Sequence, residues 1–328
     1  MAAVFATAAI VVPITASPAN AATEITFWSW RPEDKVFYEA QAAKFLAATG
    51  ISVKFTPYVA TEYNAILATA LTAGSGPDVM QVRPYGGMSN LSDAGNFLAL
   101  TTKDVPALAK MSAGTLAGVQ GYASKKQYGL PYATSVIGVM YNPDLLKKAG
   151  VSSAPKTRTE FAAAAKAVSG LGGNVSGWVI PLSQTNPNGI QNDIMSLVWA
   201  SGGSMLKSGK PNLTGNAEVK SVLTFVKGMW DAGSITPGAF TLAEPDKVTE
   251  FTNGRAGMMI DSLSHITQIK TATPDLNFSI HALPKADAYS GKGGIPYASW
   301  GIGISKDSKY PVQAAKLLAY LMSTPVNT

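Results

Sequence analysis

Residues 24–81 decide the fold, because three short β-prone runs divide them: Glu24-Ile-Thr-Phe-Trp28, Ser52-Val-Lys-Phe-Thr56 and Pro77-Asp-Val-Met-Gln81. Between each pair of runs, apolar residues recur with the 3.6-residue period of an amphipathic helix. The expected order is therefore β-α-β-α-β, which predicts a parallel sheet with helices on both of its faces. The sequence indicates an α/β protein.

Two loops of this predicted sheet lie where a ligand would bind. Ligands of open α/β sheets sit outside the carboxyl ends of the strands. Here those ends are Ser29-Trp-Arg-Pro32 after the first run and Val82-Arg-Pro-Tyr-Gly-Gly87 after the third. Each loop supplies one aromatic and one basic candidate, namely Trp30 with Arg31 and Tyr85 with Arg83.

A second α/β series begins after Tyr128-Gly-Leu-Pro131. Strands are predicted at Ile137–Tyr141, Trp178–Leu182 and Ala256–Ile260, with helices between them. Thr157 and Glu160 form the pattern of a capping box at the start of one of these helices. A chain of 328 residues is long enough for two lobes that each bury a core.

The N-terminal residues have most features of a secretory signal peptide. Residues 1–21 contain no charged side chain, and a short apolar run ends in Ala19-Asn-Ala21, which is typical of a cleavage site. The basic residue that normally precedes the apolar run is absent. We expect export of the chain and a periplasmic, secreted or cell-surface location.

The composition argues against several classes of protein. The chain has no cysteine, so disulfides, thiolate metal sites and a lipid anchor on cysteine are excluded. The net charge is +6, but the basic residues are dispersed as singles and pairs, which does not favour nucleic-acid binding. With only two histidines, we expect no metal site, no cofactor and no catalytic residues.

Five segments recur in a known family in the same order. They are Ile25–Trp30; Ala73–Val79; Tyr128–Tyr132 leading to Val139–Leu145 and Lys148-Ala-Gly150; Phe251–Met258; and Gly293-Gly294 leading to Gly301–Lys306. Each segment is weak evidence alone, but their order holds over about 300 residues. The chain resembles the family 1 extracellular solute-binding proteins, the sugar-binding group that includes maltose-binding protein.

The resemblance implies a type II periplasmic-binding-protein fold. Each of the two lobes would have a central sheet flanked by helices, and the ligand cleft would lie between the lobes. Residues 22–132 with 277–324 would form the first lobe and 137–262 the second, with hinge crossings at 132–137 and 261–277. Family members continue for roughly a quarter more of their length, so we expect the second lobe to be incomplete in this sequence.

The same resemblance implies a function. The chain would be a monomeric receptor that binds a sugar or small oligosaccharide and delivers it to the membrane permease of an ABC importer. Sugars present C–H faces and hydroxyls, so aromatic rings and planar polar groups are the expected contacts. The candidate ligand-binding residues are Trp30, Arg31, Arg83, Tyr85, Ser135, Gln184, Asn186, Asn188, Gln191, Asn192, Asp261, Ser264 and Trp300.

Each candidate also has a structural explanation. Trp30, Tyr85 and Trp300 could pack in the core or under a loop, and the two arginines could be solvated at the surface. Residues 184–192 could form a plain polar loop. Ser135 aligns with a carboxylate of the maltose-type receptors, which indicates a different sugar. His265 fits a hinge or cap better than a ligand contact.

Two other functions compete with sugar binding. The same fold could bind an amino acid, a polyamine or a ferric ion, although the acidic cluster or tyrosine pair that such ligands require is not evident. A secreted glycosidase would need two carboxylates facing one bond, and no such motif occurs. We therefore expect a binding protein and not an enzyme.

Overall fold

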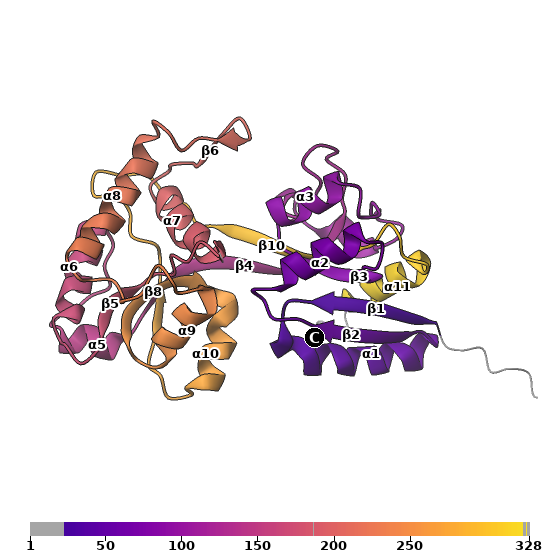
Figure 1. Ribbon diagram of the computed structural model, residues 1–328, viewed down its shortest axis with the longest axis horizontal. Helices are drawn as coiled ribbons and strands as arrows, with labels where there is room; N and C mark the ends of the chain where they lie inside the picture. The colour runs from indigo at the N-terminus through magenta and orange to yellow at the C-terminus, as the bar shows by residue number, and fades with distance from the viewer. Residues whose placement is uncertain (1–22, 186, 324–325, 327–328) are drawn as a thin grey trace, which may run out of the picture.

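The computed structural model describes residues 23–185, 187–323 and 326, which fold into two lobes (Figure 1). The predicted signal peptide, residues 1–21, lies outside the described residues. In Figure 1 the strands β4 and β10 run between the lobes, and helices surround the sheet of each lobe. The predicted two-lobed α/β fold is confirmed.

The first lobe begins with the predicted β-α-β-α-β unit. Its elements are β1 (Glu24–Ser29), η1 (Pro32–Asp34), α1 (Lys35–Thr49), β2 (Ser52–Pro57), α2 (Tyr63–Thr72), β3 (Val79–Val82), α3 (Gly86–Asp93), η2 (Pro106–Lys110), α4 (Ala113–Ala117), and later β10 (Tyr297–Ile304) and α11 (Pro311–Leu321). The sheet order is β2-β1-β3-β10, and β1 is parallel to both of its neighbours. The loops after β1 and β3 therefore leave the same edge of the sheet.

The second lobe follows β4 (Gly129–Tyr141). Its elements are α5 (Pro143–Lys148), α6 (Arg158–Ser169), β5 (Ser176–Val179), α7 (Asn188–Ala200), β6 (Leu206–Lys207), β7 (Lys210–Pro211), α8 (Ala217–Asp231), α9 (Glu244–Thr252), β8 (Ala256–Ser262), η3 (Leu263–His265), α10 (Ile266–Ala272) and β9 (Ser279–His281). The predicted capping box starts α6: the Thr157 side chain accepts from the Glu160 amide, and Glu160 accepts from the Thr157 amide.

A single long strand makes the first passage between the lobes. The N-terminal part of β4 pairs with β10, up to the pair Val136 and Tyr297. From Ile137 onward β4 pairs with β8 and β9 of the second lobe. The change of partner falls within the segment 132–137 that the sequence marks as a crossing.

The return to the first lobe comes later than the sequence predicts. Residues 279–281 form β9, which extends the second-lobe sheet by pairing with 139–141 of β4. Further along, Lys285 donates its amide to the Lys156 carbonyl, and Gly294 donates to the Trp199 carbonyl. Residues 277–296 thus belong to the second lobe, and the chain returns at Tyr297. This placement replaces the crossing expected at 261–277 and the first-lobe segment expected from 277.

Each lobe has its own core. Phe27, Phe45 and Leu318 are buried in the first lobe, whereas Phe161 and Trp178 are buried in the second. Within the described part of the chain, no helix combines the length and the apolar character that a membrane crossing requires.

Candidate ligand-binding cleft

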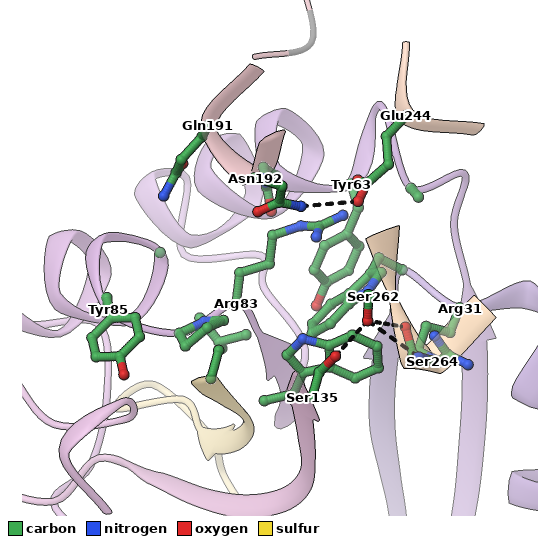
Figure 2. Close-up of a pocket in the computed structure, with 18 of the residues that line it drawn as sticks. Arg31, Tyr63, Arg83, Tyr85, Ser135, Gln191, Asn192, Glu244, Ser262 and Ser264 are labelled. Carbon is green, nitrogen blue, oxygen red and sulfur yellow. Dashed lines mark hydrogen bonds between the residues drawn. The ribbon is translucent and has the colours of Figure 1, made fainter. Parts of the chain in front are cut away.

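A cavity of about 680 Å³ lies between the lobes. The loops after β1 and β3 and the helix α2 line it from the first lobe. Residues of α7, α9 and η3 line it from the second lobe, and the strands β4 and β10 contribute where they pass between the lobes. Side chains from both lobes are directed into this space (Figure 2).

An aromatic cluster forms the first-lobe wall. The Trp30 ring lies 5.8 Å from Tyr63 and 5.6 Å from Trp300, measured between centroids, and the Trp300 contact is edge-to-face. Only 3% of Trp30 is exposed, because these rings and the guanidinium of Arg83 surround it. Trp30 thus borders the cavity as part of a packed cluster. The open platform that a sugar would stack on is not visible at this residue.

The two arginines of this wall differ in their partners. Arg31 donates Nε to Asp34 at 2.6 Å and forms an ion pair with Glu33 at 3.2 Å, so nearby carboxylates neutralise it. Arg83 forms no ion pair with any described residue. Its guanidinium lies 5.2 Å above the Trp30 ring, and its buried Nε has no hydrogen-bond partner among the described residues. Arg83 is therefore the unpaired cation of the first-lobe wall.

Tyr85 is held in a strained backbone conformation at the cleft. Its φ is 53° and its ψ is −112°, a region that residues with a Cβ rarely adopt. The Tyr85 amide donates to the Gly118 carbonyl at 2.6 Å, and its hydroxyl donates to the Tyr297 carbonyl at 2.9 Å. Nearly half of the side chain (48%) remains exposed. These contacts hold a solvent-accessible ring at the rim of the cavity.

Three serine hydroxyls connect the strands at the back of the cleft. Ser135 of β4 is hydrogen-bonded to Ser262 at the end of β8, and Ser262 is hydrogen-bonded to Ser264 at 2.7 Å (Figure 2). All three residues line the cavity. Ser135 pairs with β10 on one side and reaches β8 through its hydroxyl, so the chain of hydroxyls lies where the lobes meet.

The second-lobe wall carries amides, a carboxylate and an imidazole. Asn192 Nδ2 donates to Glu244 Oε1 at 3.1 Å, and Gln191 and His265 also line the cavity. His265 Nδ1 lies 2.7 Å from Asp261 Oδ2 behind the wall. The Asp261 side chain is fully buried and does not line the cavity. Asp261 is thus placed to orient His265 and not to contact a ligand.

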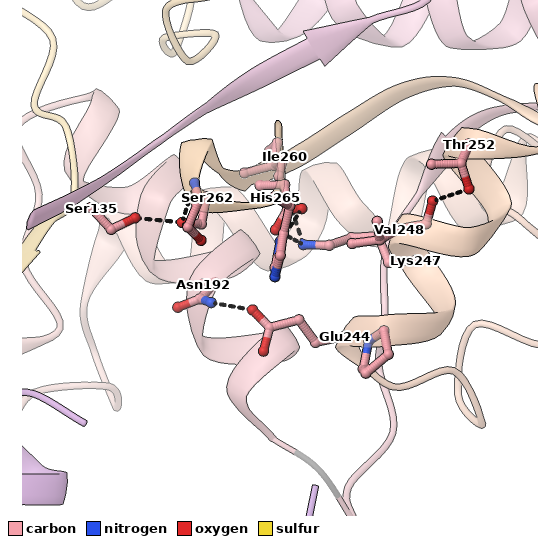
Figure 3. A network of polar contacts seen from close by, with 12 residues as sticks. Ser135, Asn192, Glu244, Lys247, Val248, Thr252, Ile260, Ser262 and His265 are labelled. Carbon is pink, nitrogen blue, oxygen red and sulfur yellow. Dashed lines mark hydrogen bonds and ion pairs between the residues drawn. The ribbon is translucent and has the colours of Figure 1, made fainter. Parts of the chain in front are cut away.

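A buried lysine stands behind the same wall (Figure 3). Lys247 Nζ lies 3.1 Å from Asp193 Oδ2 and 3.3 Å from Asp261 Oδ1, and it donates to the Ile260 carbonyl at 2.6 Å. All three charged side chains are fully buried. Because a buried charge is tolerated only when it is paired, this network fixes α7, α9 and β8 relative to one another.

The network changes the ionisation of its members. Burial raises the pKa of Asp261, but the charges of His265 and Lys247 and the hydrogen bond from His265 outweigh burial and bring it to about 2. Burial lowers the pKa of His265, but the Asp261 carboxylate outweighs burial and raises it above its ordinary value. Glu244 also raises it, whereas Lys247 opposes the rise. The folded state therefore binds the His265 proton more tightly than the unfolded chain does.

We expect the His265→Gln substitution to remove a pH-dependent part of the stability. Since the folded-state pKa of His265 is raised, its contribution is complete below the unfolded value near 6.5 and is lost as the pH rises through the folded value. The wild type should therefore lose unfolding free energy over this rise, and His265→Gln should not show that loss. Urea titrations from pH 5.5 to 9 measure the slope.

The chain's other histidine, His281, supplies the control. It is hydrogen-bonded to Ser279 on an exposed strand, so His281→Gln should leave the slope of stability against pH unchanged. An unchanged slope in His265→Gln would contradict the assignment.

The structure brings many of the sequence candidates to one cavity. Those that line it are Trp30, Arg31, Arg83, Tyr85, Ser135, Gln191, Asn192, Ser264 and Trp300. Gln184 is exposed on the loop before α7 and is not among the lining residues. Asn186 lies outside the described residues. Asn188 is the first residue of α7, but its side chain is not described.

Other lining residues were not among the candidates. Examples are Glu33, Tyr63, Asn64, Trp199, Glu244, Ser262, His265, Gln268 and Tyr297. The sequence around Glu244 does indicate the start of a helix, because an acidic residue followed by Pro245 is typical of the first turn. Nothing in its neighbourhood indicates that this helix end faces the first lobe. His265 was interpreted as a hinge or cap residue, and it is both the last residue of η3 and a residue of the cavity wall.

Two lobes joined by strands, with a polar and aromatic cavity between them, define a solute-binding protein. The chain belongs to the bacterial extracellular solute-binding proteins, because the sequence pattern of that family matches residues 40–328. The resemblance found in the sequence is confirmed.

Sequence relatives support this assignment. A lactose-binding protein of Rhizobium radiobacter is 26% identical over 303 residues, covering 87% of this chain and 67% of the relative. A protein of Brucella abortus (strain 2308) is 30% identical over 199 residues, covering 60% of this chain and 46% of the relative. The matched part is thus about half the length of the Brucella relative.

Solved structures share the fold. A solute-binding protein of an ABC transporter from Thermotoga lettingae, bound with α-D-tagatose, superposes with a TM-score of 0.83 at 24% identity. This alignment covers 93% of this chain and 78% of the other. The GacH receptor of Streptomyces glaucescens, solved unliganded and with acarbose, has a TM-score of 0.77 at 21% identity, with coverages of 94% and 77%.

Proposed function

We propose that this chain is the solute-binding receptor of an ABC importer and captures a sugar or small oligosaccharide between its lobes. The observation that carries the proposal is the interlobe cavity, whose walls combine aromatic rings with hydroxyl, amide and guanidinium groups. The lactose-binding relative and the tagatose-bound structure support the choice of a sugar.

The chemistry of the walls suits a polyhydroxylated ligand. Tyr85 is 48% exposed and offers its aromatic ring to the cavity. Gln191 and the chain of serine hydroxyls offer donors and acceptors on the opposite side and at the back. A volume of about 680 Å³ falls within the usual range of roughly 300–1,000 Å³ for small-molecule sites.

The same proposal covers location and partners. We place the mature receptor outside the cytoplasm, in the periplasm or at the cell surface, after removal of residues 1–21. It acts as a monomer and delivers its ligand to a membrane permease. The extracellular character of the family supports this location.

A ligand screen tests the proposal. The protein is titrated calorimetrically against mono-, di- and oligosaccharides, with amino acids, polyamines and ferric ion as the competing classes. We expect binding by a carbohydrate and no turnover of that carbohydrate after long incubation. Binding restricted to a non-sugar class would assign the alternative ligand, and release of hydrolysis products would assign an enzyme.

Tyr85→Ala tests the rim of the cavity. The residue has an exposed ring and a peripheral hydrogen bond, so alanine should weaken sugar affinity by about 1–2 kcal/mol, or five- to thirtyfold. The melting temperature of the unliganded protein should change little, since alanine keeps the Cβ and hence the backbone strain.

Tyr310→Ala is the matched control, because Tyr310 is similarly exposed (37%) and lies before α11, away from the cavity. Loss of stability without loss of affinity in Tyr85→Ala would assign Tyr85 to loop packing alone.

A further inference from the structure

Two charged groups face the cavity from opposite lobes without an ion-pair partner among the described residues. They are Arg83, after β3, and Glu244, at the start of α9. We propose that Arg83 and Glu244 form an ion pair across the cleft when the lobes close, so that the closed protein selects a ligand without net charge. This inference rests on the proposed function, because closure around a solute is the motion that brings the two groups together.

The contacts around Arg83 leave its guanidinium on the cavity side of the first-lobe wall without an acidic partner in its own lobe. Its guanidinium rests 5.2 Å above Trp30, which limits the side chain to the cavity side of the aromatic cluster. The neighbouring Arg31 already binds both acidic residues of η1, Glu33 and Asp34. The carboxylates of this loop are therefore paired with Arg31, and Arg83 has no acidic partner among the described residues of its own lobe.

Glu244 is the corresponding group of the second lobe. One of its carboxylate oxygens accepts a hydrogen bond from Asn192 at 3.1 Å. The charge of Glu244 acts on His265, but His265 pairs with Asp261, and no cation of the described chain lies within ion-pair distance of the Glu244 carboxylate. The nearest candidate by position in the helix, Lys247, is turned inward to Asp193 and Asp261. In Figure 2 the Arg83 guanidinium and the Glu244 carboxylate are directed into the same part of the cavity.

Closure makes the pairing favourable. When the cleft closes and water leaves it, an unpaired charge loses its hydration and gains nothing in return. Two opposite charges that come together also lose hydration, but their mutual attraction compensates for that loss. A ligand with a net charge would pair with one of the two groups and leave the other unpaired in the closed cavity. A polyhydroxylated neutral ligand leaves the pair intact and uses the remaining hydroxyl and amide groups.

Charge reversal and charge exchange test the pair. Arg83→Glu and Glu244→Arg each place like charges on both walls, so each should weaken affinity for the sugar found in the screen by about tenfold or more. The double variant Arg83→Glu/Glu244→Arg restores opposite charges and should recover to within about threefold of the wild type. Two residues that only contact the ligand would instead give additive losses, and the double variant would be the weakest.

A second readout needs no ligand. Because the chain has no cysteine, Lys44→Cys on α1 and Lys220→Cys on α8 supply two exposed labelling positions, one on each lobe. Single-molecule energy transfer then measures the fraction of closed molecules. Each reversal should lower the closed fraction about tenfold relative to the wild type, and the exchange should restore it.

Matched controls have the same changes of charge outside the cavity. Lys103→Glu is exposed in the first lobe and Asp231→Arg is exposed in the second, and both should leave affinity and closure unchanged. Failure of every carbohydrate to bind, with the closure pattern intact, would reject the proposed function but not the pair. Sugar binding without recovery in the double variant would reject the pair, and tight binding of a polyamine or of ferric ion, which carry a net charge, would reject the selection of uncharged ligands.

Discussion

Lys247→Ala is expected to cost about 3–5 kcal/mol of unfolding free energy, the usual cost of removing one partner from a buried ion pair. Lys247 has no exposed surface and lies within 3.3 Å of carboxylate oxygens of both Asp193 and Asp261. Alanine would leave these two carboxylates facing each other in the interior with one counter-charge fewer. His265 can compensate only Asp261, which it contacts.

The loss should depend on pH. Burial, opposed by Lys247, already raises the pKa of Asp193 to about 7, and removing Lys247 raises it further. A folded-state pKa above the unfolded value means that the native state binds the extra proton, so the stability of Lys247→Ala should increase as the pH is lowered from 8 to 6. Guanidinium titrations at both values measure this difference.

Lys227→Ala is the control for the loss of a lysine. Lys227 pairs with Asp231 at the exposed surface of α8, where such pairs contribute only about 0–1 kcal/mol. Equal losses in Lys227→Ala and Lys247→Ala would show that burial of the network does not matter to stability.

Trp30→Ala should be the most damaging change to the cavity wall, with a loss of about 3–5 kcal/mol of stability. Trp30 is almost fully buried and contacts Tyr63 and Trp300, so alanine leaves a void in the aromatic cluster. It also removes the surface on which Arg83 rests. Affinity for the sugar should therefore fall as well, by about tenfold, because the loop after β3 loses its support.

Thermal unfolding and calorimetric titration separate these two effects. Trp230→Ala is the control, since Trp230 is 41% exposed on α8 and lies outside the cavity. It should lose less stability and keep full affinity. A Trp30→Ala protein with normal stability and greatly reduced affinity would mean that the indole acts mainly as a ligand platform.

Local patterns in the sequence determined the framework of this protein. The alternation of β-prone runs with helical periods predicted the β-α-β-α-β unit, and it placed Trp30 and Tyr85 on loops that leave one edge of the sheet. The capping box at Thr157 was equally readable, because both of its partners lie within one helical turn. Such features depend on neighbours a few residues apart, which a sequence displays directly.

Other features were decided only when distant segments met. Because β9 pairs with β4, the chain returns to the first lobe only at Tyr297. The sequence does not predict this position, because an edge strand of three residues has too little pattern to indicate which strand it pairs with. Asp193 and Lys247 are 54 positions apart in the sequence and form a buried ion pair. Asp261 also contacts Lys247, and for this reason its side chain lies behind the cavity wall and not in the cavity. Glu244 faces the first lobe for the same reason: the packing of α9 on its own lobe, and not its local sequence, fixes the direction of that side chain.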